Sequence, residues 1–369
     1  MKNIRIFLDK TVFVEKLTKA LKFCSSRFFS SNTFQGIMLK KEKNQIIIYS
    51  TNFSFFYLAK IENNQEGEFK IFFDPRKVLE FVSLFNPGNF FIEVTEKSIV
   101  FEQEKNKGEF PIYQTDDFPE SPNLKNLEKQ KIETDFFRKN LPLLLFSASQ
   151  DNTRPVLTGI NFVSKNDVNH IVATDGFRLS LVLIEKEVDF PQVIIPSFFL
   201  SEILKTIKEE KEVYFVFNQQ EKMLTVFINK EEISTRVIDG EYPPYEKVIP
   251  IEKKTAIIVE KNDFLRAVKL ISVFARDFSN IIVLKTEKTG LRISPKITDK
   301  ETNHSIIDSE VKGEEQKIAF NYKFLLDFLN NVSSKRVVIE LLRPDAPAVF
   351  KEEKNNRFLH IIMPVRIQD

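Results

Sequence analysis

Few side chains in this sequence have the type and spacing that catalysis or metal binding would require. Asp116 and Asp117 form an adjacent carboxylate pair, which could exchange protons or bind a cation, but they fall in a proline-containing, turn-prone segment. The histidines have none of the spacings that metal ligands show. They are His170, His304 and His360. We therefore predict that these residues have no catalytic or metal-binding role.

The glycines and the cysteine lead to the same interpretation. The nine glycines form no Gly-x-x-x-x-Gly-Lys or Gly-x-Gly-x-x-Gly phosphate-binding motif and no Gly-x-Ser-x-Gly nucleophile elbow. Cys24 is the only cysteine, which excludes an intrachain disulfide and a cysteine-rich metal site. A single thiol and no recognisable secretory signal indicate a cytoplasmic protein. No apolar run approaches the roughly 18 residues of a membrane span, so we predict no membrane segment and no cofactor.

Basic side chains on the helical segments offer a different chemistry, which is contact with a polyanion. The net charge of +2 is too balanced to indicate a nucleic acid by itself, so such a surface depends on where the charges lie. Lys16 and Lys19 fall on the helical face opposite Phe13 and Leu17, and basic residues recur on later helices. An ordinary solvated face of mixed charge is the alternative, and Glu15 supports it.

These helical segments belong to one pattern that occurs three times in the chain. Gly159 matches Gly36, and Thr174 matches Thr51, each at an offset of one third of the 369 residues. Asn280 matches Gly159 at nearly the same offset. Duplication for stability alone is one explanation, but repeats of compact domains more often build a ring, an arc or an array.

Each copy is predicted to contain two helices and several strands. The first helix of each copy has apolar residues on one face, at spacings of four and three. These residues are Phe13, Leu17 and Ala20, then Phe137, Leu141 and Leu144, and finally Phe264, Val268 and Ile271. Pro142 should kink the helix of the second copy or delay its start. Short β-rich runs separated by polar turns make up the remainder, which is typical of an α+β fold.

Two proline-containing, turn-prone segments separate the copies. They are Asp117–Asn123 and Asp239–Tyr245. We therefore expect three domains of similar length, in which the first contains residues 1–127, the second contains residues 128–252 and the third contains residues 253–369.

Four segments in register with this repeat resemble the hallmark segments of a known family. They are Arg154–Gly159, Ala173–Leu179, Asp239–Pro250 and Ile361–Ile367. The family is the bacterial sliding clamp, the β subunit of DNA polymerase III. Arg76 and Lys77 after Pro75 match it as well, as does Phe320–Asn321 before Leu325–Leu326–Asp327. The resemblance covers the whole chain.

The resemblance implies three repeats of a DNA-clamp domain, with two helices inside and antiparallel sheets outside in each. A head-to-tail homodimer of such chains forms a six-domain ring that encircles duplex DNA and slides along it. Twelve helices, each about 10 Å wide, would enclose a hole about 38 Å across, which accommodates a duplex. The implied protein is a processivity factor without catalytic activity, and it would act in the cytoplasm, associated with the nucleoid.

The implied partners are double-stranded DNA, the polymerase α subunit, the clamp loader and other proteins with a clamp-binding motif. The resemblance places an apolar peptide-binding pocket between the second and third domains, which suits short hydrophobic peptides. Carried over residue by residue, the pocket comprises Leu157, Thr174, Gly176, Phe177, Arg178, Leu179, Pro243, Val248, Pro347, Ile361, Met363, Pro364, Val365, Arg366 and Ile367. Phe177 stands where the family commonly has histidine, and core packing is the alternative role for Leu157 and Met363.

Two further sets of residues follow from the resemblance. Weak, sequence-independent contact with DNA is assigned to Lys16, Lys19, Arg27, Arg76, Lys77, Arg154 and Lys323. The dimer junction, where the first domain of one chain meets the third domain of the other, is assigned to Val273 and Phe274, for which a place in the core is the alternative. Two other kinds of protein compete with a clamp, namely a non-ring repeat scaffold that binds only proteins and an enzyme with an unrecognised site.

Overall fold

The structure is a computed structural model of the chain and describes residues 4–24, 36–113, 118–124, 127–186, 192–207, 209–276, 279–288, 290–296 and 303–366. Four residues discussed above, Arg27, Asp116, Asp117 and Ile367, lie outside these ranges. The chain divides into two compact units. The first is Met1–Thr134 with Lys205–Val237, and the second is Asp135–Leu204 with Ile238–Asp369.

The first unit contains two antiparallel sheets. Four strands form the smaller sheet, in the order β1 (Ile4–Asp9), β6 (Asn89–Val94), β7 (Ser98–Gln103) and β8 (Asn106–Pro111). Eight strands form the larger sheet, in the order β5 (Phe69–Phe73), β2 (Ile37–Glu42), β3 (Gln45–Thr51), β4 (Phe55–Glu62), β16 (Glu231–Arg236), β15 (Met223–Ile228), β14 (Glu212–Asn218) and β9 (Gln130–Glu133).

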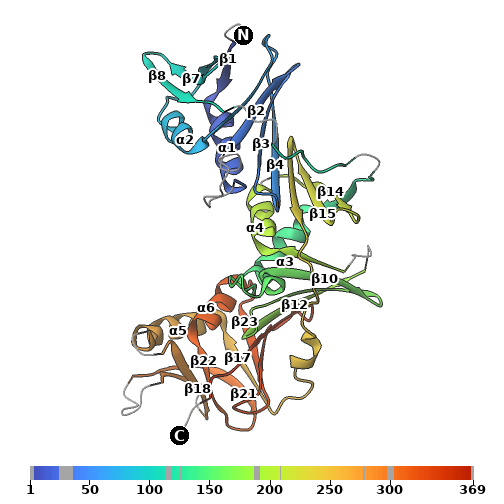
Figure 1. The fold of residues 1–369 in the computed structure, drawn as a ribbon. Coiled ribbons are helices and arrows are strands. Elements are labelled where there is room, and N and C mark those ends of the chain that lie inside the picture. The colour runs from blue at the N-terminus through green and yellow to red at the C-terminus, as the bar shows by residue number, and fades with distance from the viewer. Residues whose placement is uncertain are drawn as a thin grey trace. The chain divides into compact units, whose positions relative to one another are not determined.

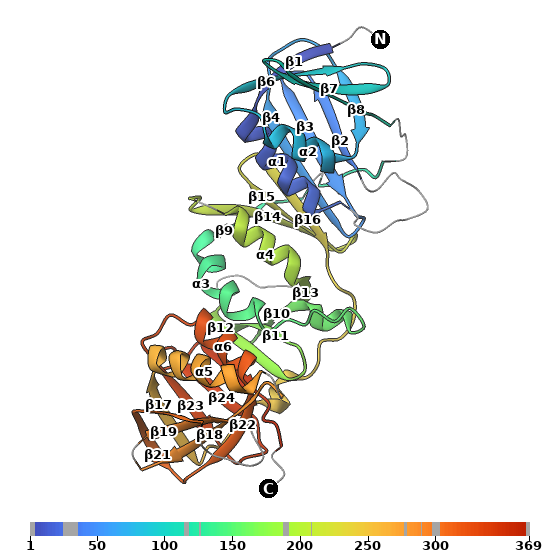
Figure 2. The same ribbon diagram turned by 90° about the vertical axis from the view of Figure 1, so that its left-hand side faces the viewer.

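Two helices of the first unit, α1 (Lys10–Lys22) and α2 (Pro75–Ser83), lie side by side against these sheets (Figures 1 and 2). Both begin at an aspartate whose carboxylate accepts a hydrogen bond from a backbone amide of the first turn. α2 also begins with a proline, which has no amide hydrogen to leave unpaired. The predicted apolar face of α1 is fully buried, so burial of one face holds this helix in place.

The second unit also contains two antiparallel sheets. Nine strands form the larger sheet, in the order β13 (Val193–Pro196), β10 (Gly159–Lys165), β11 (Val168–Thr174), β12 (Arg178–Glu185), β25 (Phe358–Ile362), β24 (Ala348–Glu352), β23 (Arg336–Leu341), β17 (Thr255–Glu260) and β21 (Ser309–Gly313). Four strands form the smaller sheet, in the order β20 (Ser305–Ile307), β19 (Gly290–Pro295), β18 (Ile281–Glu287) and β22 (Lys317–Asn321).

The helices α5 (Lys261–Ala275) and α6 (Tyr322–Asn331) of the second unit also lie side by side (Figures 1 and 2). Two more helices, α3 (Thr134–Leu145) and α4 (Ser197–Thr206), belong to the middle of the chain. The prediction that Pro142 delays the start of its helix is wrong, because α3 begins eight residues earlier, at Thr134, and contains Pro142. Two short 3₁₀ helices, η2 (Pro155–Thr158) and η3 (Tyr245–Val248), lie in the loops.

The order of the elements repeats three times, which confirms the predicted α+β repeats. The strand order β5-β2-β3-β4 recurs as β13-β10-β11-β12 and as β22-β18-β19-β20. The order β1-β6-β7-β8 recurs as β9-β14-β15-β16 and as β17-β23-β24-β25. We number the repeats first to third in chain order. Sheets continue from one repeat to the next, through the pair β4–β16 in the first unit and the pair β12–β25 in the second.

Phenylalanine supplies most of the largest fully buried side chains, as expected for a chain with 38 phenylalanines and no tryptophan. In the first repeat, Phe13 of α1 packs on Phe90 and Phe101 of the smaller sheet, with ring centroids 5.4 and 6.0 Å apart. In the third repeat, Phe328 of α6 packs on Phe350 with a centroid separation of 5.5 Å. Aromatic pairs at these distances add to the stabilisation from area burial.

Candidate functional site

A tight turn at Thr174–Arg178 organises the predicted pocket. The Thr174 hydroxyl donates to the Arg178 carbonyl oxygen (2.6 Å) and accepts from the Gly176 amide (3.1 Å). One carboxylate oxygen of Asp175 accepts from the amides of Phe177 and Arg178, at 2.9 and 3.0 Å. Gly176 has φ +93°, a conformation that glycine adopts without steric cost. Side-chain oxygens therefore cap the turn, as aspartate and threonine commonly do.

The turn leads into the strand pair that forms the floor of the site. Leu179 of β12 lies directly opposite Ile361 of β25, and the Met363 amide donates to the Phe177 carbonyl oxygen at 2.8 Å. Leu179 and Ile361 belong to an apolar cluster that also contains Val172, Leu181, Tyr245 and Val349. The structure thus brings together the predicted residues Thr174, Gly176, Phe177, Leu179, Ile361 and Met363.

The loop from Asp239 to Ile249 packs over this floor. Gly240 has φ +128°, and a Cβ atom there would lie 2.7 Å from Val156 Cγ1, so only glycine allows this close approach. Tyr242 packs against the apolar cluster, and burial is the main cause that raises the pKa of its phenol. Tyr242 and Tyr245 were not among the predicted pocket residues, although both stand in the Asp239–Tyr245 segment that the sequence singled out.

The other predicted pocket residues differ in exposure. Phe177 is 60% exposed, Val248 39% and Met363 37%, and a backbone hydrogen bond joins Met363 to Phe177. We refer to these three exposed apolar residues as the rim. Exposure argues against core packing as the role of Met363, whereas Leu157 is buried, as core packing requires. Pro243 and Arg366 are exposed, and Pro347, Pro364 and Val365 are half-buried.

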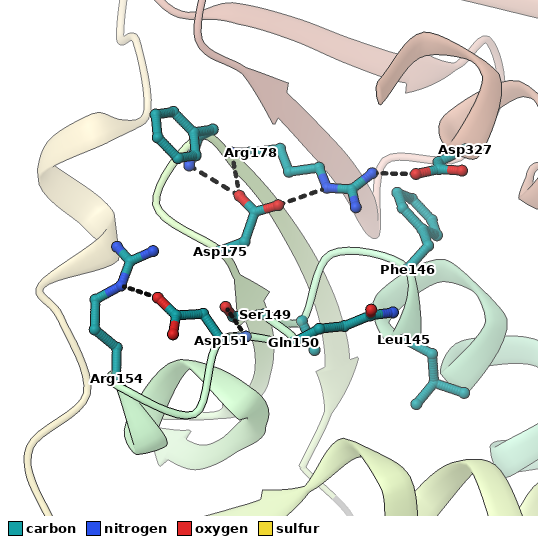
Figure 3. A pocket seen from close by; sticks show the side chains of 11 residues that line it. Leu145, Phe146, Ser149, Gln150, Asp151, Arg154, Asp175, Arg178 and Asp327 are labelled. Atoms are coloured by element: carbon teal, nitrogen blue, oxygen red, sulfur yellow. Dashed lines mark hydrogen bonds and ion pairs between the residues drawn. The ribbon is translucent and has the colours of Figure 1, made fainter. Parts of the chain in front are cut away.

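Arg178 is held by groups of its own chain (Figure 3). Its Nε donates to the second carboxylate oxygen of Asp175 at 3.0 Å, and its Nη1 donates to Asp327 on α6. The guanidinium also lies 4.6 Å from the ring centroid of Phe324 and 5.7 Å from that of Phe146. Its side chain is only 11% exposed.

A pocket of about 530 Å³ opens beside this arginine (Figure 3). It brings Arg154, which the sequence assigned to DNA, next to Phe177 and Arg178 of the predicted peptide pocket. Arg154 pairs with Asp151 at 3.6 Å. The remaining lining residues are Leu145, Phe146, Ala148, Ser149, Gln150, Asp151, Asp175 and Asp327. Sequence reasoning missed all eight as pocket residues, although Asp175 stands in the Ala173–Leu179 segment that it singled out. The other seven come from a helix end, a loop and a second helix whose approach only the fold determines.

Two of the lysines assigned to DNA converge on one buried carboxylate. Lys16 and Lys19 of α1 both donate to Glu231 of β16, the second at 2.7 Å, and the Tyr57 hydroxyl donates to it at 3.1 Å. Glu231 is 3% exposed, and Glu15 lies 3.1 Å from Lys19. These lysines therefore join the first repeat to the second.

The other residues assigned to DNA lie at the surface. Lys77 and Lys323 are exposed at the first turns of α2 and α6. Arg76 is also exposed and pairs with Asp74 at 3.3 Å. Arg27 lies outside the described residues.

The residues assigned to the dimer junction are exposed on α5. Val273 and Phe274 are about half exposed, as is Leu270, while Phe264, Val268 and Ile271 on the other face are buried. The alternative that Val273 and Phe274 belong to the core is therefore wrong.

Two of the three histidines, His360 and His170, have packing roles. His360 is fully buried, its Nδ1 lies 2.9 Å from the Ser180 hydroxyl, and its ring stacks on Phe328. His170 Nδ1 lies 2.9 Å from the Tyr245 hydroxyl. Within the described ranges, no group of three or more His, Cys, Asp or Glu residues could hold a metal ion. None of the helices there is long and apolar enough to cross a membrane.

Three two-helix repeats joined edge to edge, with an apolar rim beside one such junction, define a DNA-clamp type of protein. Three family models match in order: the N-terminal domain of the DNA polymerase III beta subunit at residues 4–123, its central domain at 131–244 and its C-terminal domain at 246–366. The beta sliding clamp of Halalkalibacterium halodurans is 31% identical over 265 residues, which cover 68% of each chain. The chain belongs to the DNA polymerase III β subunit family.

Two further relatives extend the likeness over nearly the whole chain. The beta sliding clamp of Buchnera aphidicola subsp. Rhopalosiphum padi is 24% identical over 368 residues, covering 98% of this chain and 99% of the relative. The crystal structure of the sliding clamp from Bartonella birtlesii bound to griselimycin superposes with a TM-score of 0.91 at 24% identity, covering 99% of this chain and 100% of that one.

Membership of this family confirms the function that the resemblance implied. The family is that of the sliding clamps, which are processivity factors of DNA polymerase and not enzymes. The chain is therefore a replication protein that forms a homodimeric ring on DNA and binds the polymerase, the clamp loader and other partners. The two competing hypotheses, an enzyme and a non-ring scaffold, are excluded.

Proposed function

We propose that the chain acts through three clamp domains, residues 1–127, 128–252 and 253–369, and that it holds partner peptides at the rim beside the β12–β25 junction. The single observation that carries this proposal is the exposed apolar rim of Phe177, Val248 and Met363 on a well-packed floor. Exposed apolar side chains grouped around a rigid base are typical of a site that another molecule covers. The relative that binds griselimycin supports the proposal, since it shares the fold.

A short peptide with two or three large apolar side chains fits this rim. Burial of each such side chain contributes about 1.5–3 kcal/mol. After the cost of ordering the peptide, the net affinity is roughly micromolar. That strength lets several partners exchange on one ring.

The proposed dimer junction repeats the two junctions inside the chain. β4 pairs with β16 and β12 pairs with β25, so the next pair in the series is β20 with β8 of the partner subunit. Matching Phe137 with Phe264 places Phe146 at the position of Val273. Phe146 packs 5.1 Å from His360 of the following repeat. By this analogy Val273 and Phe274 pack on the first domain of the partner.

The proposed contacts with DNA rely on the exposed Lys77 and Lys323, together with Arg76 and Arg154, and are weak and sequence-independent. Lys16 and Lys19 add little, because Glu231 neutralises part of their charge. The proposed location is the cytoplasm, at the nucleoid, where such a ring meets its DNA.

The experiment measures fluorescence anisotropy of a labelled peptide from the C-terminus of the polymerase. Val248→Asp and deletion of Met363–Asp369 should each abolish binding while leaving the dimer intact. Ile251→Asp is the matched control, since Ile251 is fully exposed three residues beyond Val248. Unchanged peptide affinity in both altered proteins would show that the pocket lies elsewhere.

A further inference from the structure

We propose that Arg178 is a positioning residue of the peptide site, which fixes the shape of the rim through the bridge Asp175–Arg178–Asp327. This inference rests on the peptide site proposed above. It adds to the role that the resemblance implied, in which Arg178 is part of the pocket surface that meets the peptide.

Two of the five N–H donors of the guanidinium are engaged within the chain. Nε donates to Asp175 and Nη1 donates to Asp327, while the rings of Phe324 and Phe146 lie near the group. The side chain is 11% exposed.

The bridge acts on the rim through Asp175. One oxygen of that carboxylate accepts from the Phe177 and Arg178 amides, and the other accepts from Arg178 Nε. The carbonyl oxygen of Phe177 in turn accepts from the Met363 amide at 2.8 Å. The orientation of one carboxylate therefore sets the position of both Phe177 and Met363, two of the three rim residues.

An internal control shows why this turn carries an arginine. The matching turn of the first repeat makes the same bonds: Thr51 Oγ1 donates to the Phe55 carbonyl at 2.7 Å, and Asn52 Oδ1 accepts from the Ser54 and Phe55 amides at 3.1 and 2.8 Å. Asn52 is neutral and Phe55 stands where Arg178 stands. A neutral amide holds the turn without a cation, whereas the partly buried charge of Asp175 requires one.

Asp327 anchors the far end of the bridge. It lies on α6 of the third repeat, four residues after Lys323, and its side chain is 43% exposed. The arginine thus connects the rim-forming turn of the second repeat to a helix of the third. Loss of Asp327 frees the guanidinium to move, so the rim loses its fixed geometry although Asp327 touches no rim residue.

The test uses two labelled polymerase peptides that differ only in whether an acidic residue is replaced by glutamine. Arg178→Ala should weaken binding of both peptides by the same factor, about tenfold, because charge-assisted hydrogen bonds have this magnitude. Asp327→Asn should weaken both by a smaller, equal factor, and Asp327→Glu should restore most of the affinity. The double substitution should be no worse than Arg178→Ala alone, because both disrupt one bridge.

Asp263→Asn is the matched control, since it breaks a comparable surface pair with Arg266 (3.1 Å) on the neighbouring helix and should leave affinity unchanged. Thermal unfolding of each variant separates the two roles, because a bridge that only stabilised the fold would lower the Tm without changing the affinity at low temperature. Wild-type affinity in Asp327→Asn, or a loss in Arg178→Ala that disappears with the neutral peptide, overturns the inference. Failure of the wild-type protein to bind either peptide overturns the peptide site itself, and with it this role.

Discussion

Two junctions between repeats share one backbone design but differ in what they expose. At the β4–β16 junction the turn Thr51–Phe55 lies beside Arg236, whose amide donates to the Ser54 carbonyl at 2.8 Å. At the β12–β25 junction the turn Thr174–Arg178 has the same relation to Met363, whose amide donates to the Phe177 carbonyl at the same distance. The two turns therefore share this backbone hydrogen bond, and the side chains around them differ.

The first junction is closed by its own chain. Phe118, just beyond the smaller sheet, is buried against Tyr49 and Phe72, each with a ring centroid 5.3 Å away. Arg236 donates through Nε to the Phe53 carbonyl at 3.3 Å, so a cation occupies the place of Met363. At the second junction Tyr242 also packs on the floor, but Met363 stands in place of the cation and is exposed. A few side chains thus distinguish the junction at which we propose peptide binding from the other one.

The two junctions also differ in the charge of the side chains buried at matching positions of their strands. The first junction buries the carboxylate of Glu231 between Lys16, Lys19 and the Tyr57 hydroxyl. At the second junction, Ser180 matches Tyr57 in the strand register, and it contacts the neutral ring of His360. At these matching positions, the first junction is therefore stabilised by ion pairs and the second by packing and a neutral hydrogen bond.

The largest expected effect is that of removing the charge at the first junction. Glu231→Gln leaves Lys16 and Lys19 partly buried, with the more exposed Glu15 as their remaining counter-ion, which should cost about 3 kcal/mol of stability. Hydrogen exchange of the β16 amides measures the loss. Glu232→Gln is the control, since its pair with Lys60 at 2.7 Å is more exposed and should contribute less than about 1 kcal/mol. Equal effects of the two substitutions would contradict the ionic character of this junction.

The third junction, between subunits, should respond almost as strongly. Val273→Asp places a charge in an apolar contact and should weaken the dimer about a hundredfold, equivalent to about 3 kcal/mol. Sedimentation velocity should then show monomers at micromolar concentration. Lys269→Asp, on the same helix at an exposed position, is the control. A folded Val273→Asp protein that remains dimeric removes this residue from the interface.

The difference between the rims can be tested by exchanging their side chains. Met363→Arg introduces the residue of the first junction and should weaken peptide binding more than tenfold, because a charged group replaces an apolar contact of about 2 kcal/mol. Anisotropy with the polymerase peptide provides the measurement. Arg236→Met, at the closed junction, should leave the peptide affinity unchanged. A second bound peptide in that variant would mean that Arg236, and not Phe118, keeps the first junction closed.

The neutral histidine makes the second junction sensitive to acid. Burial, with a contribution from the nearby Arg178, lowers the pKa of His360 to about 3 from 6.5. Below pH 6.5 the unfolded chain binds a proton that the folded chain excludes. As the pH is lowered from 6.5 to 3, the free energy of unfolding therefore decreases by about 1.4 kcal/mol per pH unit. Hydrogen exchange of the β25 amides at pH 7 and pH 5 tests this. His360→Ile, which introduces the residue at the matching position of β16, should remove that dependence.

The sequence predicted the repeats, the family and the tight turn at Asp175–Gly176, because these depend on local patterns. Apolar spacing marked the helices, and the Thr-Asp-Gly segment has the chemistry of a tight turn. The sequence did not predict that Glu231 accepts hydrogen bonds from two lysines of a helix more than two hundred residues earlier. It also did not predict that Asp327 accepts one from Arg178. Periodicity shows that a lysine faces away from the core of its own helix, but only the packed fold shows which carboxylate it meets.

The smallest expected effect separates lysines that look alike in the sequence. Lys323 is exposed at the start of α6, whereas Lys16 is bound to Glu231. Release of counterions from DNA scales with the charge that a protein brings to the phosphates, so Lys323→Gln should lower the slope of log K against log salt by about 0.9 per contact. Lys16→Gln should leave the slope unchanged, because that charge is already neutralised within the protein. Filter binding of closed circular DNA at several salt concentrations measures both slopes, and equal slopes for the two variants would mean that the lysines of the first junction leave Glu231 when DNA enters the ring.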